Sequence, residues 1–216
     1  MAEFALYGYF RSSAAFRVRI ALNLKGIAPE LRFVHLLRGG GEQHAEAYRA
    51  LNPQAQIPTL IHQGQAIGQS LAAIEYLDEI HPQPPLLPAT PIERARVRQI
   101  AYLVACDIHP VNNLRVANYL RDEIGAGAEA IGTWQRHWMQ LGFEALESLL
   151  GQEGTGRFCH GDSPTLADIC LIPQLANARR ASLDLAPYPK LLAIEETALA
   201  LPAFRDALPA NQPDAE

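Results

Sequence analysis

Hydrophobic and polar positions alternate between strand-like and helix-like patterns through the first 80 or so residues. The short, aromatic-rich run at 5–10 ends in polar residues and predicts a strand. Apolar side chains recur at i, i+4 and i+8 through 14–25, which predicts a helix that Ser12 or Ser13 caps and that Gly26 follows. The other elements predicted here are strands at 31–36, 59–61 and 65–67, a short helix at 42–51, and a helix at 71–80 capped by Ser70. The order βαβ and then ββα indicates a small α/β sheet domain.

The pattern changes at a proline-rich segment, because residues 81–91 hold five of the 16 prolines. Prolines at this density cannot continue a helix or a central strand, so the segment is predicted to be a linker. Only helical patterns follow it, at 92–124, 128–150, 165–178 and 191–198, with a short tail helix near 203–208. The predicted organisation is therefore a sheet domain at 1–82, a linker at 83–91 and an all-α domain at 92–216.

Composition narrows the classes of protein that fit. With 49% hydrophobic and 19% charged residues, the 216-residue chain can bury a core. A net charge of −5 gives no electrostatic reason for a nucleic-acid partner. No apolar stretch approaches the roughly 18 residues of a membrane span, and no signal peptide is recognisable. The three cysteines are odd in number and lack Cys-x-x-Cys spacing, which argues against a disulfide framework, so a cytoplasmic location is expected.

Three short motifs offer chemistry at predicted turns and helix starts: residues 11–17, residues 56–59 and residues 68–71. A helix N-terminus presents unpaired N–H groups that stabilise an anion, and a serine hydroxyl there could donate to a thiolate and lower the pKa of its thiol. Taken singly, each serine is better explained as a simple cap, and a proline before a strand is commonly a turn residue.

Taken together, the three motifs resemble the thioredoxin-like domain of glutathione transferases, and the linker followed by an all-α domain fits the same fold. Further stretches resemble the zeta class of that family, which includes bacterial maleylacetoacetate and maleylpyruvate isomerases. These stretches are 10–13, 17–22, 24–26, 50–53, 56–60, 69–72, 74–77, 86–88 and 106–115. The resemblance extends from Leu6 to Pro213.

The resemblance implies a glutathione-dependent cis–trans isomerase of maleylacetoacetate, acting as a homodimer. Ser12 would hydrogen-bond the glutathione sulfur, and Arg11 with Arg179 or Arg180 would face a dicarboxylate substrate. The residues implied to bind glutathione are Ser12, Ser13, Arg17, Gln43, Gln56, Ile57, Pro58, Gln69, Ser70, His109, Asn113, Leu114 and Arg115. The alternatives are a maleylpyruvate isomerase, an enzyme acting on α-haloacids, and a transferase-like fold kept only for binding.

Some features depart from the family or favour a structural role. Ala14 stands where zeta-class proteins commonly carry cysteine, so chemistry that needs a protein thiol there is in doubt. Asp168 has the spacing of a helix capping box behind Thr165. Cys106 and His109 could share a helix face, but two ligands do not make a zinc site, and no metal is expected. Trp134 and Trp138 are expected to pack against each other, and not to form a binding cage.

Overall fold

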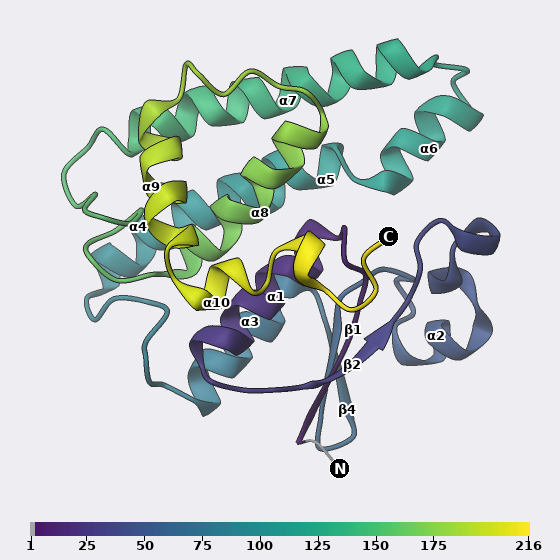
Figure 1. Cartoon of the computed structure of the whole chain (residues 1–216), viewed down its shortest axis with the longest axis horizontal. Coiled ribbons are helices and arrows are strands. Elements are labelled where there is room, and N and C mark those ends of the chain that lie inside the picture. Colours follow the sequence, from purple (N-terminus) through teal and green to yellow (C-terminus); the bar gives the residue numbers. More distant parts are fainter. Residues whose placement is uncertain (1–2) are drawn as a thin grey trace. The chain divides into compact units, whose positions relative to one another are not determined.

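A computed structural model describes residues 3–216, which divide into two compact units (Figure 1). The first, called here the sheet unit, runs to Leu86 and also includes Ala200–Glu216. The second, called the helical unit, comprises Leu87–Leu199. The two units meet at Leu86 and Leu87, inside the predicted linker at 83–91, and residues 200–216 group with the sheet unit although they were predicted to belong to the all-α domain.

The sheet unit contains a four-stranded mixed sheet. Its strands are β1 (Phe4–Gly8), β2 (Glu30–Phe33), β3 (Thr59–His62) and β4 (Gln65–Gly68), in the order β2-β1-β3-β4. β1 and β2 are parallel, while β1 with β3 and β3 with β4 are antiparallel. The turn between β3 and β4 has Gln63 at φ 49° and Gly64 at φ 77°, as a two-residue hairpin with a primed turn requires. The βαβ-ββα order predicted from the sequence is confirmed.

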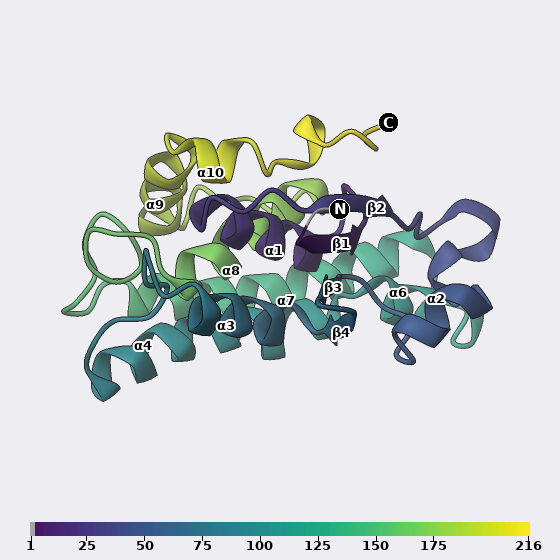
Figure 2. The same ribbon diagram turned by 90° about the horizontal axis from the view of Figure 1, so that it is seen from below.

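Helices α1 (Ser13–Leu24) and α3 (Ser70–Ile80) pack against each other beside this sheet (Figure 2). Every residue of α1 from Ala15 to Leu22 is buried, including two arginines. Gly26 follows α1 with φ 68°, as predicted for a residue just past a helix end. The expected cap at Ser70 is wrong by one position: Gln69 is the N-cap and Ser70 is already helical.

The connection from β2 to β3 is less regular than the predicted helix at 42–51. It holds two 3₁₀ turns, η1 (Arg38–Gly40) and η2 (Glu42–His44), and the short helix α2 (Glu46–Leu51). Ala45 separates η2 from α2 because its backbone is extended, with φ −61° and ψ 142°. The predicted strand at 31–36 likewise ends early, at Phe33.

Residues 200–216 join the sheet unit through α1. α10 (Pro202–Arg205) packs on α1, and η4 (Pro209–Asn211) follows it. The side chain of Phe204 is fully buried, and the Asn23 side chain donates to the Ala203 carbonyl at 3.0 Å. These contacts explain why the tail belongs with the sheet and not with the helices that precede it.

The helical unit contains the long helices α7 (Ala128–Leu149), α8 (Leu166–Arg180) and α9 (Pro189–Leu199). The pattern predicted as one helix at 92–124 is divided into α4 (Pro91–Tyr102), a π-helical turn η3 (Leu103–Ile108), α5 (His109–Val111) and α6 (Leu114–Asp122). Pro110 has no N–H for a helical hydrogen bond, and Asn113 caps a new helix, so the single helix cannot continue.

Helix α8 lies in the core of the helical unit and begins with the predicted capping box. Thr165 Oγ1 accepts from the Ala167 amide at 3.3 Å, and Asp168 Oδ2 accepts from the Thr165 amide at 2.8 Å. Burial raises the pKa of Asp168 above its usual value, although hydrogen bonds from Cys159 and Thr165 act in the opposite direction. The structural role predicted for Asp168 is confirmed.

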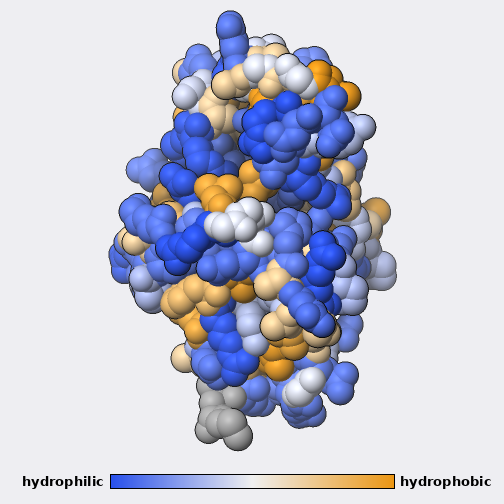
Figure 3. All heavy atoms as spheres, turned by 90° about the vertical axis from the view of Figure 1, so that its right-hand side faces the viewer, coloured by the Kyte–Doolittle hydropathy of each residue, from blue (hydrophilic) through white to orange (hydrophobic). Residues whose placement is uncertain are grey.

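The tryptophans of α7 are in edge-to-face contact, as expected for packing. The rings of Trp134 and Trp138 have centroids 5.7 Å apart, and Trp134 Nε1 donates to the Val111 carbonyl at 2.9 Å. On the face shown in Figure 3, hydrophilic residues predominate and hydrophobic residues form separate patches. Within residues 3–216, no helix is both long and apolar enough to cross a membrane.

Candidate active site

Ser12 stands where β1 passes into α1. It is the N-cap of α1, with an extended backbone at φ −71° and ψ 115°, and its Oγ accepts a hydrogen bond from the Ala15 amide at 3.1 Å. A hydroxyl can donate one hydrogen bond and accept two, so this cap uses an acceptor site and leaves the proton available. No acceptor for that proton is found among the described residues. Ser12 can therefore cap the helix and donate to an anion at the same time.

The loop from Tyr9 to Ser12, called the β1–α1 loop, presents this hydroxyl. The Ser12 amide donates to the Tyr9 carbonyl at 2.9 Å, and the rings of Tyr9 and Phe10 are buried. Arg11 is exposed, and its guanidinium lies 5.5 Å from the centroid of the Phe10 ring. Burial raises the pKa of Tyr9, and the positive charge of Arg11 opposes that shift. The loop thus places a cation one residue before Ser12.

The start of α3 is, after the start of α1, a second helix N-terminus with polar groups that suit an anion. Gln69, its N-cap, has φ 64° and ψ 118°, which is a strained conformation for a residue with a side chain. Its Nε2 donates to Gln54 Oε1 at 2.7 Å. Ser70 is buried, and its Oγ accepts from Arg17 Nη1 at 3.3 Å. Because Arg17 belongs to α1 and is itself buried, this contact brings a positive charge to the N-terminus of α3, where a carboxylate is favoured.

The segment between these two helix starts carries the predicted motif Gln56-Ile57-Pro58. The Ile57–Pro58 peptide bond is cis. The Gln56 carbonyl accepts from Tyr48 Oη at 2.7 Å and from Asn52 Nδ2 at 2.8 Å. Neither the N–H nor the carbonyl of Ile57 hydrogen-bonds to another backbone group among residues 3–216. A molecule with a backbone of its own could hydrogen-bond to these peptide groups.

Gln43 provides a buried polar atom in the same unit. Its Nε2 lies 3.2 Å from His44 Nε2, while its Oε1 has no hydrogen-bond partner among the described residues. Gly41 has φ 105°, and a Cβ there would come within 2.4 Å of Gln43 Nε2, so the close approach of this side chain requires glycine. A buried acceptor without a partner is costly, and a ligand donor would remove that cost.

The predicted residues of the helical unit gather at the break between η3 and α6. His109 begins α5, and Asn113 caps α6, its Oδ1 accepting from the Arg115 amide at 3.1 Å. Leu114 is the first residue of α6, and Arg115 follows it with an exposed side chain. The break therefore brings these four residues to one place within their unit.

Arg179 and Arg180 end α8 and are engaged within the helical unit. Arg179 forms a two-point ion pair with the buried Glu195, in which Nη2 lies 2.5 Å from Oε2 and Nη1 contacts Oε1. Arg180 donates to the Asn177 side chain. This pairing gives Arg179 a structural role, and its predicted contact with a substrate stays a prediction.

The Arg17–Ser70 contact joins the second turn of α1 to the start of α3. Ser13 and Pro58 are buried beside them. Tyr48 and Asn52, which hold the Gln56 carbonyl, were not among the predicted site residues, although residues 50–53 lie in a stretch that resembles the zeta class. Sequence reasoning also missed two residues that hold the β1–α1 loop, Arg19 and Asp214. Arg19 had one available signal, a charge within an apolar helix.

The comparison with known proteins agrees with this geometry. The profile of the glutathione S-transferase N-terminal domain matches residues 6–85, and that of the C-terminal domain matches residues 133–197. The chain belongs to the glutathione S-transferase family. The family likeness inferred from the sequence is thereby confirmed, as is the fold of a thioredoxin-like sheet domain followed by helices.

Individual relatives narrow the likeness to one branch of the family. The chain is 49% identical to a probable maleylacetoacetate isomerase of Vibrio cholerae over the full length of both proteins. It is 48% identical to a maleylpyruvate isomerase of a Ralstonia species, covering 97% of this chain and 98% of that one. A holo structure of a bacterial zeta-class maleylpyruvate isomerase has a TM-score of 0.95 at 47% identity, covering 98% of this chain and all of the other.

Proposed function

We propose that this protein is a glutathione-dependent isomerase that converts maleylacetoacetate to its trans isomer, fumarylacetoacetate. The observation that carries the proposal is the Ser12 hydroxyl, which caps α1 through an acceptor site and keeps its proton for an anion. The relatives named as isomerases of this kind cover essentially the whole chain, so the likeness includes both units and is not confined to the glutathione-binding fold.

The residues of the sheet unit fit glutathione by their chemistry. The start of α3, with Ser70 and the buried charge of Arg17, suits the α-carboxylate of the γ-glutamyl group. The peptide groups of Ile57 suit the backbone of the cysteinyl residue. The unpartnered Gln43 Oε1 suits a donor from the tripeptide. Ser13, Gln56, Pro58 and Gln69 shape the same region. From the helical unit we assign His109, Asn113, Leu114 and Arg115 to the binding of glutathione.

Bound glutathione supplies a thiolate, a soft nucleophile that can add reversibly to an alkene lying between a ketone and a carboxylate and so allow rotation about that bond. Ser12 donates its proton toward the sulfur, which stabilises the ionised form and lowers the pKa of the thiol. The unpaired N–H groups in the first turn of α1 favour the same negative charge. Arg11, next to Ser12 and exposed, is suited to a substrate carboxylate and to negative charge that develops on the substrate.

The remaining assignments concern the rest of the substrate site and the setting of the enzyme. Arg179 or Arg180 is assigned to the second substrate carboxylate, and each also has a partner within the helical unit, Glu195 for Arg179 and Asn177 for Arg180. We assign the protein to the cytoplasm and expect a homodimer. We keep as a proposal that residues 1–82 form the glutathione-binding domain and that the substrate-binding domain begins at residue 92, after the linker at 83–91.

The second candidate substrate is maleylpyruvate, because a maleylpyruvate isomerase is as similar to the chain as the maleylacetoacetate isomerases are. The test is to measure kcat/KM of the purified enzyme for both diketo acids, and for an α-haloacid, with glutathione present and absent. The proposal expects the highest value for maleylacetoacetate and no turnover without glutathione. A higher value for maleylpyruvate would reassign the substrate, and retention on immobilised glutathione without any turnover would indicate a binding module.

A further inference from the structure

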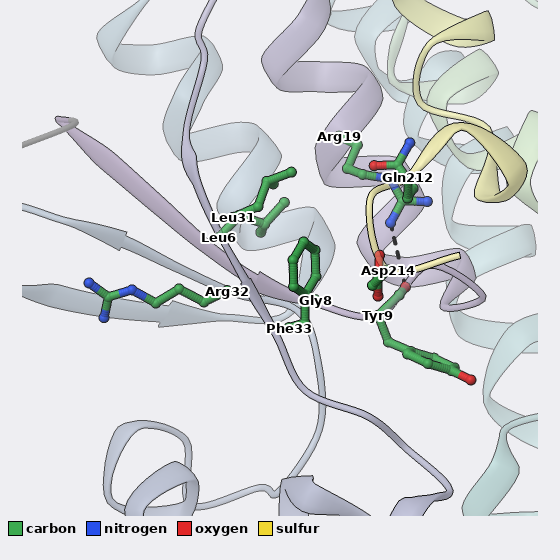
Figure 4. A pocket seen from close by; sticks show the side chains of 9 residues that line it. All are labelled: Leu6, Gly8, Tyr9, Arg19, Leu31, Arg32, Phe33, Gln212 and Asp214. Atoms are coloured by element: carbon green, nitrogen blue, oxygen red, sulfur yellow. Dashed lines mark hydrogen bonds between the residues drawn. The ribbon is translucent and has the colours of Figure 1, made fainter. Parts of the chain in front are cut away.

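The β1–α1 loop is held in place by hydrogen bonds to its backbone from two other segments of the sheet unit. The Phe10 amide donates to Asp214 Oδ2 at 2.9 Å. The Phe10 carbonyl accepts from Arg19 Nη2 at 3.2 Å, and the Tyr9 carbonyl accepts from Arg19 Nη1 at 3.5 Å. Figure 4 shows Asp214 and Arg19 next to the Tyr9 backbone, with Asp214 carried by the C-terminal segment. Two residues before Ser12, the backbone is therefore fixed from both sides.

Arg19 connects this loop to the C-terminal segment. Its Nε and Nη2 both donate to the Ala207 carbonyl at 3.1 Å, while other N–H groups reach the loop carbonyls. Burial lowers the pKa of Arg19 to about 10, and the negative charge of Asp214 opposes that shift, so the guanidinium stays charged at neutral pH. One buried cation thus bridges the loop and the segment that carries Asp214.

The C-terminal segment is itself fixed at several points, so it can act as a support. Gln212 Nε2 donates to the carbonyls of Asp206 at 2.9 Å and Leu208 at 3.0 Å. Glu216 accepts from Arg38 Nη2 at 3.0 Å. Asp214 lies between these two anchored residues. Its carboxylate is therefore presented to the Phe10 amide by a structured segment and not by a loose end.

We propose that Asp214 is a positioning residue, which acts from the C-terminal segment through the β1–α1 loop to hold the Ser12 hydroxyl where it meets the glutathione sulfur. The inference rests on the function proposed above. Its physical basis is the short path between the two residues. Asp214 holds the Phe10 amide, and the Ser12 amide is tied to the Tyr9 carbonyl, so a shift of the loop at Phe10 carries Ser12 with it. Displacements of about 1 Å can change rates by up to about a hundredfold.

The test uses Asp214→Ala, Asp214→Asn and the control Asp206→Ala. Asp206 is an acid of the same segment whose side chain is 62% exposed and contacts only its neighbour Arg205 among the ion pairs of the described residues. Three quantities are measured: hydrogen exchange of the Phe10 amide, the thiolate absorbance of glutathione bound without substrate, and kcat with KM for glutathione.

In Asp214→Ala we expect faster exchange at Phe10, a severalfold smaller thiolate fraction and a kcat about tenfold lower, with KM for glutathione within about twofold because the start of α3 is unchanged. Asp214→Asn keeps an oxygen that can accept from Phe10 and should restore most of the thiolate fraction. Asp206→Ala should match the wild type. In a Ser12→Ala background, Asp214→Ala should have no further effect on the thiolate, because the effect passes through Ser12.

Three results would overturn the inference: Phe10 exchange that does not change in Asp214→Ala, faster exchange with an unaltered thiolate fraction and kcat, or an equal loss of thiolate in the Ser12→Ala background. A purely structural role would lower thermal stability without moving the thiolate fraction. A wild-type protein that binds no glutathione would overturn the proposed function as well. One that binds and turns over, but is indifferent to Asp214→Ala, would overturn only the positioning role.

Discussion

Replacing Ser12 by alanine separates the two functions that this side chain combines. The cap is one: Oγ accepts from the Ala15 amide at 3.1 Å, and loss of such a cap costs about 1 kcal/mol, or roughly 2–4 °C in Tm for a chain of this size. Donation to the sulfur is the other. A hydrogen bond to a charged group contributes about 1.5–3 kcal/mol, so its loss in Ser12→Ala should raise the pKa of the bound thiol by about one to two units.

The size of the effect on activity follows from that pKa. If the bound thiol of the wild type titrates near 7, as we expect from a lowering of the usual value of about 8.5, half of it is ionised at neutral pH. In Ser12→Ala the ionised fraction would fall to about 10% or less, and kcat with it, by about five- to fiftyfold. The assay is an ultraviolet titration of the thiolate in the glutathione complex, followed by kcat at pH 7.

Two control variants distinguish loss of the helix cap from loss of the hydrogen bond to the sulfur. Ser12→Gly costs only a few tenths of a kcal/mol as an N-cap but lacks the hydroxyl, so it should fold nearly as well as the wild type and lose the same activity. Thr90→Ala removes the hydroxyl cap of α4, where Oγ1 accepts from the Glu93 amide at 3.4 Å, and should lose stability alone. A Ser12→Ala enzyme whose bound thiol titrates as in the wild type would refute thiolate stabilisation by this residue.

Three further changes test other parts of the account. Gln69→Gly removes the side chain from a residue at φ 64° and should raise the free energy of unfolding by about 1 kcal/mol, measured by thermal melts. The same change should weaken glutathione binding, measured by calorimetry. A loss of stability would contradict the claim that the backbone of Gln69 is strained. Ser70→Ala removes the hydroxyl that accepts from Arg17 Nη1 and should raise the Kd for glutathione about fivefold or more, with kcat nearly unchanged. An unaltered Kd would count against a carboxylate site at the start of α3. The raised pKa of Asp168 means that the folded state binds this proton more tightly than the unfolded state, so its contribution to stability is greatest in acid and declines as pH rises above about 4. The difference in Tm between the wild type and Asp168→Asn should therefore be larger at pH 4 than at pH 7. The opposite trend would show that the pKa of Asp168 is not raised in the folded state.

The parts of the fold that depend on local pattern could be predicted from the sequence. Apolar spacing located α1, and the hydroxyl followed three residues later by an acid located the capping box of α8. The pattern did not reveal the division of 92–124, because apolar side chains recur through the π-helical turn η3 just as they do in the helices beside it. The one local signal of a helix break there is Pro110, which has no backbone N–H to donate.

The candidate site was predicted in its residue types but not in its contacts. Ser12 stands at a helix start that can be read locally, whereas Arg17 and Ser70 are 53 positions apart, and only the fold brings them together. Asp214 and Phe10 are separated by 204 positions. The positive φ of Gln69 could not be foreseen either, because that conformation is imposed by the surrounding structure and is against the preference of the residue.

The central claim is that the protein lowers the pKa of a bound glutathione thiol, which is used in turnover and then returned. The most direct measurement follows conversion of maleylacetoacetate with glutathione at a small fraction of the substrate concentration, while free thiol is titrated at intervals. We predict complete conversion to the trans isomer with the amount of thiol unchanged, so that each glutathione serves many turnovers. Conversion that stops when one substrate has reacted per glutathione, with thiol lost in proportion, would contradict the account.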